Sequence, residues 1–210
     1  LKIKDYPTAI TAISSAQSLI ANMDDKIKGK FYFLKAQAFY GKKDFKTAAN
    51  AFENLFNFEN ETGKMRYTQM ATTLQNQMVQ EVYQLASDQY TAKDYKNASD
   101  SFYLTYQLSK ADTIFIYNAA VSSSLAKDYD NSLKYYKKLQ DIGYTGILKI
   151  FYATNNQTDE KEDLGDEKNR DLQVKLGLYK DPVNELTESK TGDIIKNVAY
   201  ILKTQGKTEE

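Results

Sequence analysis

The sequence predicts an all-α protein built from repeated helical hairpins, with a small α+β lobe inserted near its C-terminal end. Three observations support this prediction: a short motif recurs, small and bulky residues recur around each copy, and the pattern disappears over residues 147–191. We therefore expect helical repeats over residues 1–146, an inserted lobe over 147–191, and the first helix of a truncated further repeat over 192–210.

The recurring motif is Lys-Asp followed by an aromatic residue. Its copies are Lys4-Asp5-Tyr6, Lys43-Asp44-Phe45, Lys93-Asp94-Tyr95 and Lys127-Asp128-Tyr129. A small residue follows each aromatic residue by three positions, and a bulky residue follows it by seven: Ala9, Ala48, Ala98 and Ser132; Ile13, Phe52, Phe102 and Tyr136. Small residues let antiparallel helices approach closely, and Asp stands where a helix N-cap is needed. The motif therefore predicts the turn inside a helical hairpin.

The spacing between copies fits one repeat length with insertions. Tyr95 and Tyr129 are 34 residues apart, whereas Phe45 and Tyr95 are 50 apart, which indicates an insertion of 16 residues. An alanine precedes three of the aromatic residues by nine positions: Ala36, Ala86 and Ala120. Near the C-terminal end, Thr208 of the segment Gly206-Lys207-Thr208 follows Ala199 by the same nine positions, which indicates a further copy.

On these residues, the chain resembles the tetratricopeptide repeat (TPR) family. The family pattern falls on Tyr32, Ala36, Phe39, Phe45, Ala48, Phe52 and Leu55, and again on Val82, Leu85, Ala86, Tyr95, Ala98 and Phe102. The resemblance implies a solenoid of stacked hairpins that acts as a non-catalytic protein-interaction scaffold. For interrupted repeats of this type, it also implies a bacterial, envelope-associated protein in the periplasm or at the cell surface.

The insertion of 16 residues lies at about residues 63–78. An approximate helical stripe there favours an N-terminal extension of the next helix: Met70, Leu74, Met78, Val82 and Leu85. The extended helix would contain about 30 residues and end near Ala92. The alternative is a short separate helix followed by a break.

The lobe over residues 147–191 carries strand, turn and helix signals. In order, we expect a strand, a turn, a returning strand, a helix with Asp166 as its N-cap, and an extended edge segment: Ile150–Thr154, Asn155–Asp159, Glu160–Leu164, Asp166–Leu176 and Leu178–Leu186.

We expect that both ends of the chain fall inside a repeat. The last expected helix carries a wide apolar surface: Ile194, Ile195, Val198, Ala199, Ile201 and Leu202. We expect either that further repeats cover this surface in a longer protein or that it mediates self-association.

The composition excludes several classes of chemistry. The chain has no His and no Cys, so it has no imidazole base, no thiolate nucleophile and no Cys or His metal ligand. Its 28 basic and 28 acidic residues balance, which argues against nucleic acid as a partner. No apolar run approaches the roughly 18 residues that a transmembrane segment requires.

One carboxylate cluster is the sole candidate for a metal or acid site: Asp159, Glu160, Glu162, Asp163, Asp166 and Glu167. The residues lack the alternating spacing of a calcium-binding loop, and we expect a solvated turn. A weak cation site and a carboxylate-dependent hydrolase are the alternatives. We expect no enzyme activity, no cofactor and no metal.

The resemblance implies that the first helix of each hairpin lines a concave, ligand-binding face. That face would contain Phe33, Gln37, Tyr40, Tyr83, Ser87, Tyr90, Tyr117, Val121, Lys196 and Tyr200. Its aromatic side chains suit an unknown protein or peptide partner, or a stacked sugar ring as in a carbohydrate-binding module. The alternative is that the long helix or the inserted lobe buries these rings.

Overall fold

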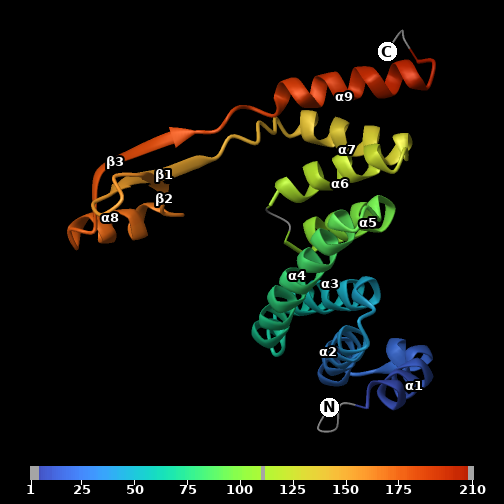
Figure 1. Ribbon diagram of the computed structural model, residues 1–210. Helices are drawn as coiled ribbons and strands as arrows, with labels where there is room; N and C mark the ends of the chain where they lie inside the picture. The colour runs from blue at the N-terminus through green and yellow to red at the C-terminus, as the bar shows by residue number, and fades with distance from the viewer. Residues whose placement is uncertain (1–4, 110–111, 208–210) are drawn as a thin grey trace. The chain divides into compact units, whose positions relative to one another are not determined.

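The computed structural model describes residues 5–109 and 112–207 of the chain (Figure 1). The described residues are mostly helical, with one small antiparallel sheet of three strands. The chain divides into two compact units, Leu1–Tyr135 and Tyr136–Glu210. The expected α-helical architecture with a small α+β segment is therefore confirmed at this level.

The first unit consists of helices packed in chain order. They are α1 (Tyr6–Ala16), the 3-10 helix η1 (Gln17–Asn22), α2 (Asp25–Gly41), α3 (Phe45–Thr62), α4 (Thr68–Thr91), α5 (Tyr95–Ser109), α6 (Ile114–Leu125) and the first half of α7 (Tyr129–Asp141). Helix α2 packs on α1 and α3, and α5 packs on α4 and α6. The first unit is thus built from neighbouring helices that contact one another.

The three copies of the motif that begin at Lys43, Lys93 and Lys127 each form a turn between two helices. Lys43, Lys93 and Lys127 adopt left-handed backbone angles, with φ of 64°, 63° and 60°. The backbone N–H of the next Asp then donates to a carbonyl near the end of the preceding helix, at 2.9 Å in all three turns. This pattern is a Schellman C-cap. Gly206 occupies the equivalent position after α9 with φ of 71°, whereas Lys4 and Thr208 lie outside the described residues.

The Asp of the motif caps the helix that follows the turn. The Asp44 carboxylate accepts a hydrogen bond from Thr47 N at 3.1 Å, and the Asp128 carboxylate accepts one from Asn131 N at 3.2 Å. Helices α1, α3, α5 and α7 therefore begin at the motif's aromatic residue. One short motif ends one helix and starts the next.

The small and bulky residues of the repeat form the core. Ala36, Ala86 and Ala120 are fully buried, as are Ala48, Ala98 and Ser132. The bulky residues seven positions after each aromatic residue are also buried: Ile13, Phe52, Phe102 and Tyr136. The Ser132 hydroxyl donates to the Ala120 carbonyl at 2.9 Å, which holds α7 close to α6. The expected use of these positions for helix packing is confirmed.

The first insertion lengthens α4 to 24 residues without a break. The expectation of an extended helix is thus confirmed, and the alternative of a short separate helix is wrong. The expected length of about 30 residues was too long, because the helix starts only at Thr68. The expected apolar stripe needs a correction, because Met70 and Leu85 are exposed. The buried side of α4 instead contains Ala71, Met78, Val79, Val82 and Ala86.

Glu59 explains why α4 starts only at Thr68. Its carboxylate is buried and accepts hydrogen bonds from the backbone N–H groups of Arg66, Tyr67 and Thr68, at 2.9–3.1 Å. The Thr68 hydroxyl donates to it as well, at 2.7 Å. The last turn of α3 therefore supplies the acceptor for the free N–H groups at the start of α4.

The second unit contains the expected lobe and a C-terminal helix. The lobe consists of β1 (Lys149–Asn155), β2 (Lys161–Asp163), α8 (Glu167–Lys175) and β3 (Tyr179–Leu186), and α9 (Thr191–Thr204) follows. The strands are antiparallel in the order β2-β1-β3. Asp166 caps α8 by accepting from Asn169 N at 2.9 Å. The order of strand, turn, strand, helix and edge strand is confirmed.

An irregularity in β3 fits its position at the edge of the sheet. The register between β1 and β3 shifts between Tyr152 and Thr154, opposite the segment that contains Asp181 and Pro182. Asp181 has φ of 49°, and Pro182 has no N–H to donate. A bulge at an edge strand accommodates both residues.

Candidate functional site

Five of the predicted concave-face residues line two pockets in the first unit. Gln37 and Tyr40 lie in a pocket of about 540 Å³, called here the α2–α4 pocket, with Tyr6, Gly41, Lys43, Leu74 and Glu81. Tyr90, Tyr117 and Val121 lie in a pocket of about 300 Å³, called here the aromatic pocket, with Phe102 and Asn118. Helix α4 contributes to both, through Leu74 and Glu81 to the first and through Tyr90 to the second.

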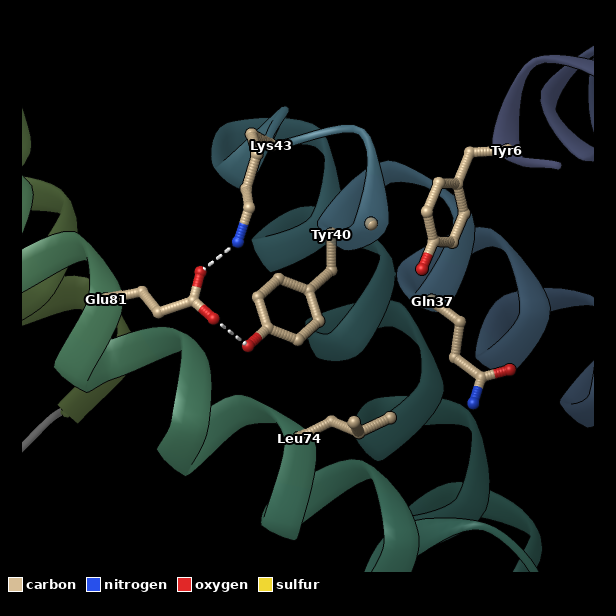
Figure 2. Close-up of a pocket in the computed structure, with 7 residues that line it drawn as sticks. Tyr6, Gln37, Tyr40, Lys43, Leu74 and Glu81 are labelled. Carbon is tan, nitrogen blue, oxygen red and sulfur yellow. Dashed lines mark hydrogen bonds and ion pairs between the residues drawn. The ribbon is translucent and has the colours of Figure 1, made fainter. Parts of the chain in front are cut away.

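The α2–α4 pocket is organised around the Glu81 carboxylate (Figure 2). Tyr40 O–H donates to Glu81 Oε1 at 2.8 Å, and Lys43 Nζ forms an ion pair with Oε2. Lys43 Nζ also lies 5.5 Å from the centre of the Tyr40 ring. Figure 2 shows Tyr6, Gln37 and Leu74 around the remaining space. The end of α2 and the turn after it are thus tied to the middle of α4.

The electrostatics of this pocket follow from these contacts. The hydrogen bond from Lys43 lowers the pKa of Glu81, although burial opposes the shift. Burial, followed by the hydrogen bond to Glu81, raises the pKa of Tyr40 to about 12. Near neutral pH, Glu81 is therefore ionised and paired with Lys43, and Tyr40 is neutral and donates its proton.

Gly41 shapes the wall of the same pocket. A Cβ atom at this position would lie 2.1 Å from the Tyr6 ring. No other residue type therefore fits at the end of α2 while Tyr6 keeps its position.

The aromatic pocket belongs to a larger group of rings from α4, α5 and α6. Tyr90 lies 5.5 Å from Tyr95 and 6.4 Å from Phe102 between ring centres. Tyr83 packs 5.4 Å from Phe115 and 6.4 Å from Phe102. Tyr83 and Tyr90 nevertheless remain 40 % and 38 % exposed. The rings are held by their neighbours and still offer apolar surface to a ligand.

The other predicted face residues have different environments. Phe33 is buried and stacks on Tyr67 with ring centres 5.1 Å apart, so its ring belongs to the core. The Ser87 hydroxyl donates to the Tyr83 carbonyl within α4. Lys196 and Tyr200 lie on α9 in the second unit, where Tyr200 is 58 % exposed.

Carboxylates of the predicted cluster form ion pairs, hydrogen bonds and a helix cap within the lobe. Asp159 pairs with Lys180 at 2.7 Å, which lowers the pKa of Asp159. Glu162 accepts from Asn155 at 2.9 Å and from the Tyr179 hydroxyl at 2.7 Å. Asp166 caps α8. Within the described ranges, no three Asp or Glu side chains gather as a candidate metal site.

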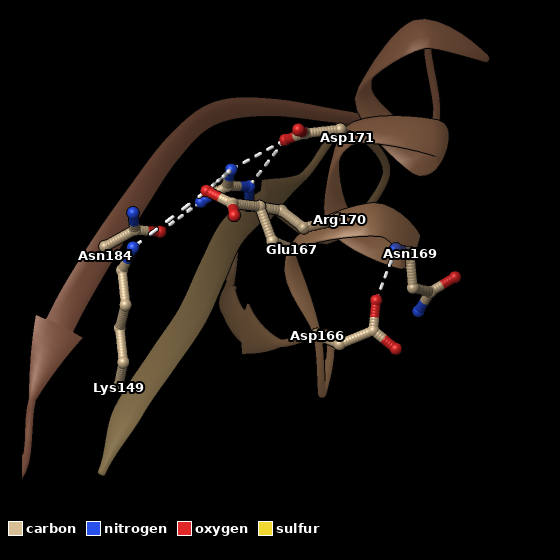
Figure 3. A network of polar contacts seen from close by, with 7 residues as sticks. All are labelled: Lys149, Asp166, Glu167, Asn169, Arg170, Asp171 and Asn184. Atoms are coloured by element: carbon tan, nitrogen blue, oxygen red, sulfur yellow. Dashed lines mark hydrogen bonds and ion pairs between the residues drawn. The ribbon is translucent and has the colours of Figure 1, made fainter. Parts of the chain in front are cut away.

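Arg170 is the centre of the polar network in the lobe (Figure 3). It is 7 % exposed, lies 5.5 Å from the Phe151 ring, and donates to Asp171 at 2.7 and 2.9 Å and to Asn184. Glu167 lies 3.6 Å from the same guanidinium group and 4.0 Å from Lys149 Nζ. These contacts join α8 to β1 and β3, which indicates a structural role.

Sequence reasoning missed several pocket residues: Tyr6, Gly41, Lys43, Leu74, Glu81, Phe102 and Asn118. Tyr6, Lys43 and Phe102 were part of the repeat pattern, but the pattern assigns them to turns and packing. No local sequence pattern predicts Glu81 as a pocket residue, because its role depends on Tyr40 on another helix and on Lys43 in the turn after that helix.

No protein-family model matches the chain, and no curated protein matches it. Among the described helices, none combines the length and apolar character needed to cross a membrane.

Proposed function

We propose that this chain is a non-catalytic interaction scaffold of the TPR type, which binds a peptide segment of a protein partner on the face formed by α2, α4 and α6. The observation that carries this proposal is the aromatic pocket. Its three rings, one amide and one aliphatic side chain come from α4, α5 and α6, and its lining contains no charged residue.

The repeated turn supports a solenoid arrangement. Three turns share the left-handed Lys and the same hydrogen bond to the preceding helix, and helices begin at equivalent residues after them. Similar turns inside hairpins with similar core residues favour the same packing step at each repeat. Such an array places α2, α4 and α6 on one face.

The chemistry of the aromatic pocket suits an apolar side chain of a peptide. Rings fixed by their neighbours lose little conformational freedom on binding, so burying a Leu, Met or Phe side chain against them is favourable. Among the described residues, the Asn118 side-chain amide has no hydrogen-bond partner, so it can donate to and accept from a peptide backbone.

A selection experiment tests the proposal. A displayed random peptide library is selected on the immobilised chain, and the dissociation constant of an enriched peptide is measured by fluorescence anisotropy. Tyr90→Ala and Tyr117→Ala should each weaken binding about tenfold or more, because aromatic residues in desolvated pockets dominate binding energies.

The matched control is Tyr103→Ala on α5, whose ring stacks on Tyr135 at 4.6 Å and lines neither pocket. This variant should bind like the original chain. Failure to enrich any peptide, or equal binding by Tyr90→Ala, would contradict the proposal.

A second candidate function is carbohydrate binding on tyrosine rings. The observation that favours it is the α2–α4 pocket, where Tyr6 and Tyr40 stand beside an amide and a neutralised ion pair. Aromatic faces next to paired polar groups suit sugar rings, which have apolar faces and hydroxyl edges.

A further inference from the structure

We infer that the α2–α4 pocket binds a single neutral sugar ring. This inference rests on the carbohydrate-binding candidate and is independent of the peptide proposal for the aromatic pocket. Its basis is the combination of pocket size, two tyrosine rings and a balanced set of hydrogen-bonding groups at one place.

The charges of the pocket select a neutral ligand. Lys43 and Glu81 are the charged residues of its lining, and they form an ion pair with each other. An anionic ligand would have to compete with Glu81 for Lys43, and a cationic ligand would have to compete with Lys43 for Glu81. A neutral ligand leaves the ion pair intact, so neither charged group loses its partner on binding.

The hydrogen-bonding groups of the pocket match hydroxyl groups. Lys43 has three N–H donors, and the Glu81 carboxylate accepts more bonds than the two that Tyr40 and Lys43 supply. Among the described residues, the Gln37 side-chain amide has no hydrogen-bond partner, so it offers a donor and an acceptor. Sugar hydroxyls both donate and accept, and can pair with each of these groups.

The tyrosine rings supply the apolar contact. Tyr6 and Tyr40 come from α1 and α2 and flank the space that Gln37 and Leu74 also border (Figure 2). Gly41 leaves room for the Tyr6 ring, since a Cβ would lie 2.1 Å from it. The volume of about 540 Å³ is within the range of small-molecule sites.

Titration with defined oligosaccharides tests this inference. The probes are neutral glucan, mannan, galactan and xylan oligosaccharides, together with oligogalacturonate as an acidic probe and chitosan oligosaccharide as a basic probe. Isothermal titration on the whole chain should detect binding of at least one neutral probe and weaker binding of both charged probes.

Variants locate the site without relying on one substitution. Tyr6→Ala and Gln37→Ala should each weaken binding of the neutral probe roughly tenfold. Gly41→Ala should have a similar effect by displacing Tyr6, and alanine is well tolerated at a helix end, so this variant keeps the fold. Tyr103→Ala, whose ring stacks on Tyr135 and lines neither pocket, is the control and should bind normally.

The inference would be overturned by no binding of any neutral probe, or by neutral-sugar binding that survives both Tyr6→Ala and Gly41→Ala. Stronger binding of a charged probe would also overturn it. Peptide binding that is lost in Tyr90→Ala, in the absence of sugar binding, would reject the sugar site and keep the peptide proposal.

Discussion

At the scale of single residues, Glu81 shows how one side chain can join separate parts of the first unit. It accepts from Tyr40 on α2 and pairs with Lys43 in the following turn, while it belongs to α4 itself. Its side chain is still 41 % exposed, so water screens the ion pair. The contact therefore fixes the positions of the Tyr40 and Lys43 side chains in the pocket and adds little to the stability of the fold.

The lowered pKa of Glu81 predicts a small pH dependence of stability. A carboxyl group whose pKa is lower in the folded state contributes stability above its unfolded pKa, and that contribution is lost as pH falls through the folded pKa. Between pH 6 and pH 3, urea unfolding should show a larger loss for the original chain than for Glu81→Gln. Screening limits the difference to below about 1 kcal/mol. Identical pH profiles for the two proteins would contradict this assignment.

The sequence was sufficient to predict some of these residues and not others. The resemblance to the TPR family assigned Gln37, Tyr40, Tyr90, Tyr117 and Val121 to one face, and these residues line the two pockets. It assigned Phe33 to the same face, but the Tyr67 ring, from the loop after α3, stacks on the Phe33 ring. Loop conformation and pairs between helices, such as Tyr40 and Glu81, depend on tertiary contacts that no local pattern encodes.

At the scale of secondary structure, the repeated turn contains a residue that is not suited to its backbone angle. Left-handed angles cost a residue with a Cβ about 1–2 kcal/mol relative to right-handed ones, and glycine avoids this cost. Lys43, Lys93 and Lys127 occupy this position, whereas Gly206 occupies it after α9. Three of these turns therefore carry local strain that a glycine would relieve.

Lys93→Gly should stabilise the chain by about 0.5–1 kcal/mol, because relief of the strain exceeds the extra entropy of glycine in the unfolded state. Urea unfolding followed by circular dichroism measures this change. The matched control is Gln80→Gly on the exposed side of α4, which should destabilise by about 1 kcal/mol. Destabilisation by both substitutions would show that Lys93 is not strained.

Glu59 provides the second prediction at this scale. Glu59→Ala removes the acceptor for three backbone N–H groups and leaves them in a partly buried loop, so it should cost about 2–4 kcal/mol of unfolding free energy. Glu53→Ala, on the exposed side of the same helix, should change stability by less than about 0.5 kcal/mol. A small effect of Glu59→Ala in urea unfolding would show that water replaces the carboxylate.

The boundaries of α4 illustrate what the sequence could not supply. Helical periodicity predicted the long helix, but it assigned Met70 and Leu85 to the buried side, where Ala71 and Ala86 lie instead. Alanine carries little hydrophobic signal in a pattern, although close helix packing favours it. The start at Thr68 depends on Glu59, which is nine residues away on another helix.

At the scale of the whole chain, the lobe enters and leaves the helical sequence at adjacent points. Lys190 N donates to Thr145 O at 2.7 Å, and Thr187 N donates to Leu148 O at 2.9 Å. Within the described lobe, Ala153 on β1 and Arg170 on α8 are buried. These contacts are those expected of an insertion that folds on its own between two helices.

Excision of the lobe tests this organisation. Replacement of residues 148–187 by two glycines should leave cooperative helical unfolding with a free energy within about 1 kcal/mol of the original, because closing a short loop across adjacent ends costs little. Circular dichroism during urea unfolding measures this free energy and shows whether the transition stays cooperative. Loss of the cooperative transition would show that the helices need the lobe.

Amide hydrogen exchange with and without the selected peptide tests the central proposal most directly, namely that α2, α4 and α6 present one binding face. The peptide should slow amide exchange in and beside the residues of α4 and α6 that line the aromatic pocket. Exchange should slow less in α2, and it should not change in those residues of α5 that lie away from the pocket. Protection confined to α5, or to the lobe over residues 147–191, would contradict the proposal.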